Sequence, residues 1–180
     1  MTRQYFISQD VFTRFPGYMR GVVLADGIHN PPSPDELVQQ LRQAEEKLCT
    51  HLSPENITTQ PRIEAWREAY RSIGIKPSDF RPSVEALARR VLKRDPLPTI
   101  STLVDIGTLA SIQNLMPIGA HAIDHVTQDI GLRLATGGET FEPFGSDAVE
   151  HPLPGEIIFV EGDVVLTRRW TWRQAKHTLV

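Results

Sequence analysis

Two histidines and a carboxylate lie close together in the segment 119–125. His121 and His125 are four residues apart, and Asp124 precedes the second histidine. If the segment is helical, this spacing places both imidazoles on one face, where they and the carboxylate can bind a divalent metal. His121 also follows a break at residues 117–119. There it can line a pocket as a hydrogen bonder or as a general base near neutral pH. A packed or surface histidine is the third interpretation.

Basic residues gather in two stretches of the chain, residues 62–94 and 168–177. Trp170 and Trp172 alternate with arginines in the second stretch. Guanidinium groups with aromatic rings between them suit phosphate contacts and stacking on unpaired bases. The alternative is that the helices carry solvated basic faces and that the tryptophans belong to the core.

Two acidic residues follow apolar or glycine pairs. Asp105 comes after Leu103-Val104, and Glu139 comes after Gly137-Gly138. Each carboxylate has two interpretations: it contributes to a functional site, or it accepts hydrogen bonds from backbone amides at a turn or a helix start.

The composition of the chain excludes several classes of protein. The 180 residues fit one domain, and the net charge of −3 argues against a broadly basic nucleic-acid binder. Cys49 is the one cysteine, so we expect a packed thiol, no internal disulfide and a reducing cytoplasm. The sequence has no signal-peptide pattern and no apolar run of membrane-spanning length, so we expect a cytoplasmic protein without membrane contact. No phosphate-binding, dinucleotide, zinc-protease or serine-hydrolase motif occurs, so we expect no cofactor and no bound metal.

The elements that must position these residues are strands at both ends with helices between them. Apolar periodicity and capping residues predict helices that begin near Ser33, at 62–73, near Pro82-Ser83 and at 102–115. Strands are predicted at 4–8, 19–25, 130–136 and 139–144, and in a hairpin that turns at 161–163. This order indicates an α+β fold of a single domain, with three or four helices, rather than a regular βαβ repeat.

Several short segments together resemble a known module. They are residues 63–77, 81–87 with Arg90, 97–100, 103–105, 119–124, 132–135, 138–139 and 155–156. In this order and spacing the chain resembles the tRNA-binding and editing domain of the phenylalanyl-tRNA synthetase beta chain, as a stand-alone copy. The resemblance covers roughly residues 60–180, and we treat 1–180 as one domain.

The resemblance implies an α+β fold with a central pocket. In the synthetase, that pocket receives the aminoacylated tRNA end and hydrolyses a wrongly attached tyrosine. His121 falls on the position of the histidine of that pocket, with Asp124 behind it, and Glu139 falls on a Gly-Glu that follows an Arg-x-Ala strand. The chain departs from the pattern at Thr108, where the family usually has asparagine, and it lacks a later Met-Gly-Gly segment. We therefore predict His121 as catalytic, and Asp105, Thr108, Asp124 and Glu139 as substrate-binding.

Three functions remain open from the sequence. The first is hydrolysis of misacylated tRNA in trans, without aminoacylation, with phosphate contacts from Arg81, Arg89, Arg90, Arg168 and Arg169. The second is a non-catalytic module that binds a free amino acid or another small metabolite in the same pocket. The third is a metal-dependent hydrolase centred on His121, Asp124 and His125.

Overall fold

The computed structural model describes residues 4–146 and 148–180. The chain forms two compact units. The sheet unit contains the described residues of 1–27 and 121–179, and the helical unit contains residues 28–120. Five α-helices and one mixed five-stranded sheet are present among the described residues, so the predicted α+β class is confirmed.

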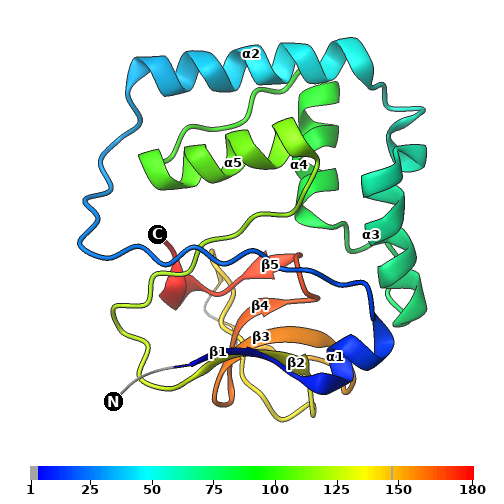
Figure 1. Ribbon diagram of the computed structural model, residues 1–180, viewed down its shortest axis with the longest axis vertical. Coiled ribbons are helices and arrows are strands. Elements are labelled where there is room, and N and C mark those ends of the chain that lie inside the picture. Colours follow the sequence, from blue (N-terminus) through cyan, green and yellow to red (C-terminus); the bar gives the residue numbers. More distant parts are fainter. Residues whose placement is uncertain (1–3, 147) are drawn as a thin grey trace. The chain divides into compact units, whose positions relative to one another are not determined.

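The sheet has the order β1-β2-β3-β4-β5 (Figure 1). Its strands are Tyr5–Ile7, Ile130–Leu134, Ile157–Glu161, Val164–Arg168 and Arg173–Gln174. β1 runs parallel to β2, and the other neighbours are antiparallel. The predicted hairpin is β3 and β4, and its turn is where the sequence placed it. The N-terminal strand β1 pairs with a strand that lies more than 120 residues later, so the sheet joins both ends of the chain.

The two faces of the sheet differ in what covers them. One face carries a buried apolar cluster made of Ala135, Phe141, Ile158, Val160, Val165 and Ala175. Phe159 alternates with Ile158 and Val160 and therefore points to the opposite face, as does Thr167, its register partner on β4. At the edge, Gly131 lies under the ring of Phe6, and a Cβ on Gly131 would lie 2.3 Å from that ring. A larger residue at position 131 would have to displace the ring of Phe6, which is 40% exposed.

Helix α1, Gln9–Arg14, buries Val11, and the residues after it pack on one tryptophan of the sheet unit. Phe15 and Tyr18 each lie 4.8 Å from the ring of Trp170, which is 2% exposed. Arg169 and Trp170 have left-handed backbone, with φ of 45° and 65°. This conformation costs roughly 1–2 kcal/mol per non-glycine residue. The buried aromatic contacts of Trp170 offset this cost. The alternative that placed the tryptophans in the core holds for Trp170, whereas Trp172 is half-buried.

Two predicted strands are wrong or incomplete. Residues 19–25 form no strand, and Val23 is 93% exposed. A strand requires a neighbouring edge with which to exchange hydrogen bonds, and the apolar pattern of this segment has none in the described structure. Residues 139–144 form only isolated bridges at Thr140, Phe141 and Pro143. Pro143 has no amide hydrogen to donate, so a continuous ladder cannot form there.

The helical unit contains α2 to α5, which span Asp35–His51, Pro61–Ser72, Ser83–Leu92 and Thr102–Asn114. The four predicted helices are confirmed, and α1 is an additional one. α2 packs against α4 and α5, and Figure 1 shows α2 and α5 side by side. Buried apolar residues from all four helices, among them Leu41, Ile63, Val84 and Ile112, form the core of this unit. Ser33 is not the N-cap of α2, because Pro34 occupies that position.

Candidate functional site

A group of side chains surrounds the ring of Phe159 on its face of the sheet. We call Tyr5, Arg20, His121, Phe159 and Thr167 the Phe159 cluster. The Nε2 atom of His121 lies 2.9 Å from Oγ1 of Thr167. The imidazole lies 5.7 Å from the centre of the Phe159 ring, at an interplanar angle of 55°. The strand pairing of Phe159 with Thr167 therefore fixes both the ring plane and one hydrogen bond of His121.

Arg20 covers the same aromatic ring. Its guanidinium carbon lies 4.1 Å from the centre of Phe159 and 5.6 Å from that of Tyr5. Among the described residues, no carboxylate lies within 4.0 Å of Arg20. The Phe159 ring contributes a cation–π contact, and without a carboxylate partner the cluster stays cationic.

The electrostatics of the cluster keep His121 neutral. Burial, the Arg20 guanidinium and His177 together lower the pKa of His121 to about 4. The sequence predicted a base that titrates near neutral pH, and the structure instead gives a neutral imidazole that is a weak base. Such a ring still donates from one nitrogen and accepts at the other. Burial raises the pKa of Tyr5 to about 12, against the lowering effect of Arg20, so its phenol stays protonated.

The geometry of residues 121–125 does not support the metal interpretation. The segment is not helical, so the face that His121 and His125 were expected to share does not form. Asp124 and His125 are exposed in a turn, whereas His121 is half-buried. No group of three or more histidine, cysteine, aspartate or glutamate side chains in the described ranges is arranged to hold a metal.

Glu139 holds a turn of the sheet unit. Its side chain is 1% exposed, and its carboxylate accepts hydrogen bonds from the amides of Thr136 and Gly137 at 2.9 Å and from Arg133. Burial alone would raise the pKa of Glu139, but the Thr136 amide, Arg133 and the Gly137 amide lower it to about 2. The carboxylate is therefore ionised and fully engaged. These hydrogen bonds are the ones expected under the backbone-binding interpretation of Glu139.

Asp105 and Thr108 belong to α5 in the helical unit. Asp105 is fully buried and accepts hydrogen bonds from the hydroxyl of Ser33 at 2.6 Å and from the amide of Ile100 at 3.1 Å. Asp105 thereby connects the loop before α2 to the start of α5. Its hydrogen bond from the Ile100 amide is of the kind that the backbone-binding interpretation predicts. Thr108 is half-buried on the same helix.

The two arginines of the C-terminal stretch that were predicted to contact phosphates bind other residues of the protein instead. Arg168 is 5% exposed and forms two hydrogen bonds to Glu156, at 3.0 and 2.9 Å, and one to Glu150 at 2.7 Å. Arg169 is 8% exposed and lies 4.4 Å from the ring of Trp172. A phosphate contact requires an accessible guanidinium, and the guanidinium of Arg168 is enclosed by these two carboxylates.

The arginines of the helical unit divide into paired and unpaired groups. The fully buried Glu85 binds Arg67 and Arg89, each at 2.8 Å, and Arg90 pairs with Asp95 at 3.1 Å. Arg81 is exposed and has no ion pair in the described part of the chain. Of the three predicted contacts in this unit, Arg81 has the most accessible charge.

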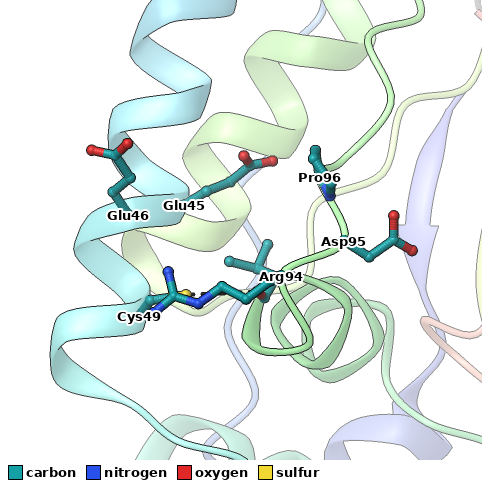
Figure 2. A pocket seen from close by; sticks show the side chains of 7 residues that line it. Glu45, Glu46, Cys49, Arg94, Asp95 and Pro96 are labelled. Carbon is teal, nitrogen blue, oxygen red and sulfur yellow. Dashed lines mark hydrogen bonds between the residues drawn. The ribbon is translucent and has the colours of Figure 1, made fainter.

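The helical unit also has a shallow pocket of about 160 Å³ between α2 and the residues after α4. Figure 2 shows Glu45, Cys49 and Arg94 at this pocket. Glu45 binds Arg42 at 2.6 Å and the Leu97 amide at 2.8 Å. The Cys49 thiol donates to the Val91 carbonyl at 3.6 Å, as expected for a packed cysteine. None of the predicted site residues lines this pocket, and ligand pockets are usually larger, roughly 300–1,000 Å³.

Sequence reasoning missed most of the Phe159 cluster. Arg20 lies in the segment that was predicted as a strand, and Tyr5 lies in a strand without a motif. Thr167 and Phe159 were predicted only as strand residues. The one available signal was a single arginine within the apolar run Met19 to Leu24, and its spacing alone indicates no chemistry.

The fold is an α+β module in which Thr167 and Phe159 hold a neutral histidine, His121. Its described residues contain no group of side chains arranged to bind a metal. Residues 65–180 match the family model of the B3/4 domain, and the chain belongs to this family. It is the domain found in the phenylalanyl-tRNA synthetase beta chain, which confirms the resemblance at the level of the family. Comparisons with curated proteins and with solved structures gave no match.

The B3/4 domain is, at the level of the family, a module associated with tRNA binding and editing. None of the helices in the described residues is long and apolar enough to cross a bilayer.

Proposed function

We propose that this protein hydrolyses misacylated tRNA in trans and that the aminoacyl ester binds at the Phe159 cluster. The observation that carries the proposal is the placement of His121. By the sequence resemblance, this residue falls on the position of the family's pocket histidine. In the structure it has a neutral imidazole, a hydrogen bond to Thr167 and an aromatic neighbour. The proposal treats residues 1–180 as one functional module, which acts on aminoacyl-tRNA in the cytoplasm.

The proposed reaction is attack of water on the ester carbonyl. Because Nε2 of His121 contacts Thr167, the other ring nitrogen, Nδ1, is the one that can orient the water. Water adds to the carbonyl carbon, the bond from that carbon to the ribose oxygen breaks, and the water proton passes to the ribose oxygen. The products are a free amino acid and uncharged tRNA. His121 is a weak base, so its contribution is positioning, and the neighbouring hydroxyl of the terminal ribose assists proton transfer.

The test is deacylation of tyrosyl-tRNA(Phe) by the purified protein, followed by a panel of other mischarged tRNAs. We expect amino-acid release that His121→Ala lowers by roughly 10²-fold, the size of effect that loss of positioning produces. His125→Ala is the matched control, because this exposed histidine lies only four residues away. Chelators should not change the rate. Absence of release across the whole panel contradicts the proposal.

The second candidate is a module that binds a free amino acid without catalysis. It is favoured by two observations: His121 is a weak base, and Arg20 has no carboxylate partner among the described residues. Protection of the protein against thermal unfolding by a free amino acid, with no effect of tRNA, would support this candidate over hydrolysis.

A further inference from the structure

Arg20 lies outside the region that defines the family. The family match begins at residue 65, whereas Tyr5 and Arg20 come from the first 27 residues of the chain. The sheet unit nevertheless combines this N-terminal segment with β3 and β4, and Arg20 thereby reaches the ring of Phe159, next to His121. Any role of Arg20 is therefore a property of this chain and does not follow from the family.

The contacts of Arg20 with the two aromatic rings leave N–H groups of its guanidinium for other partners. A guanidinium carries five N–H donors, all in its own plane. The Nε atom of Arg20 is buried and has no hydrogen-bond partner in the described structure, and the Tyr5 side chain is a hydrogen-bonding neighbour. Arg20 is half-buried, so part of this residue is accessible to solvent.

Several other arginines of the protein pair with a buried carboxylate, and Arg20 has no such partner among the described residues. Arg67 and Arg89 share Glu85, Arg42 binds Glu45, and Arg133 binds Glu139. A partly desolvated cation without such a partner favours an external anion, because burial strengthens the interaction between opposite charges.

We propose that Arg20 binds an oxyanion of the ligand, a carboxylate or a phosphate, beside His121. This inference rests on the proposed location of the ligand at the Phe159 cluster, and it adds the chemical group that the cluster selects. The anion has two sources: a phosphate of the terminal tRNA nucleotides, or the carboxylate of a free amino acid.

The experiment compares Arg20→Gln and Arg20→Lys with the wild type. Arg14→Gln is the matched control, because Arg14 is an exposed arginine of the same unit and lies outside the cluster. Binding is measured by chemical-shift changes with adenosine monophosphate, with the free proteinogenic amino acids, and with the methyl ester of any amino acid that binds. Deacylation is measured in parallel at several salt concentrations.

We expect Arg20→Gln to weaken binding of the oxyanion probe about 10- to 100-fold, the usual range for a hydrogen bond to a charged group. Arg20→Lys should restore part of this affinity, because lysine keeps the charge and the cation–π contact. A purely structural arginine would not produce this charge-dependent rescue. Unchanged amide spectra away from the cluster verify folding of each variant.

The probes distinguish the two sources. For a phosphate, adenosine monophosphate binding depends on Arg20, and the slope of log affinity for tRNA against log salt falls by about 0.7 in Arg20→Gln. If the anion is a carboxylate, a free amino acid binds the wild type and its methyl ester does not. In Arg20→Gln, the affinities for the amino acid and for its ester become equal. Both results support the inference, even if the wild type releases no amino acid from any charged tRNA. The inference is overturned if no oxyanion probe binds the wild type or if Arg20→Gln binds as the wild type does.

Discussion

Arg168 and Arg20 each lie over a phenylalanine ring of the sheet unit, at 5.8 Å from Phe141 and at 4.1 Å from Phe159. Arg168 is enclosed by Glu156 and Glu150. Burial alone would lower the pKa of the Arg168 guanidinium, but the hydrogen bonds and charges of these carboxylates raise it above its ordinary value. Arg20 has no carboxylate partner among the described residues. The same side chain is thus a structural element in one region and a candidate ligand-binding group in the other, and the nearby carboxylates make the difference.

The largest effect that we expect is a loss of stability when Arg168 loses one of its carboxylate partners. Glu156→Ala leaves Arg168 buried with only Glu150, so we expect the free energy of unfolding to fall by about 3–5 kcal/mol. Urea unfolding followed by circular dichroism measures this change.

A double variant serves as the control for that measurement. Arg168→Met with Glu156→Leu removes both charges together and should recover most of the lost stability, because neither charge is then left buried alone. A double variant as unstable as Glu156→Ala would contradict the assignment of the loss to an uncompensated arginine.

The next effect is the pH dependence of stability from His121. Its folded pKa of about 4 lies below the ordinary value of 6.5, so the unfolded chain binds a proton between these values that the folded protein does not. Stability is therefore complete above pH 6.5 and is lost as pH falls toward 4, by about 3 kcal/mol from this group. Unfolding curves at pH 7, 5.5 and 4.5 measure the loss.

His121→Gln should lose less stability than the wild type over the same pH range, since glutamine does not titrate. Arg20→Gln should reduce the loss partly, because the Arg20 charge is one cause of the low pKa of His121. Identical pH profiles for the wild type and His121→Gln would contradict the buried, neutral imidazole.

A smaller effect concerns Glu139, a carboxylate held by backbone amides and Arg133. Glu139→Gln removes the charge from the acceptor of the Thr136 and Gly137 amides, and we expect a loss of about 1–3 kcal/mol in the free energy of unfolding. Thermal unfolding measures it. Glu142→Gln, which changes an exposed carboxylate nearby, should have a much smaller effect. Equal effects would show that Glu139 is not the anchor of its turn.

The smallest effect concerns the exposed arginine of the helical unit. If Arg81 contacts a tRNA phosphate, Arg81→Ala weakens tRNA binding a few-fold and lowers the slope of log affinity against log salt by roughly 0.7–0.9, without a change in stability. Filter binding between 50 and 200 mM salt measures this slope. An unchanged slope would remove Arg81 from the predicted contacts.

The helices of the helical unit were predictable from sequence because each has its own apolar stripe and end signals. Ile63 and Tyr70 are buried on one face of α3, and Gly74 follows it with φ of 77°. The β3–β4 hairpin was also predictable, because its turn residues separate two apolar runs. The segment 19–25 has equally good strand residues, but strand formation depends on a partner that the local sequence does not specify.

Apolar periodicity, end signals and the order of short motifs are enough to predict the α+β class, the helix positions, the family resemblance and an interest in His121. The neutral state of His121 and the difference between Arg20 and Arg168 follow from the folded arrangement. Both depend on burial and on neighbours distant in the chain, such as the pairing of β1 with β2 that joins residue 5 to residue 130. Residue type and spacing fix which groups are available, whereas desolvation and the nearest opposite charge decide which of them remain available to bind a ligand.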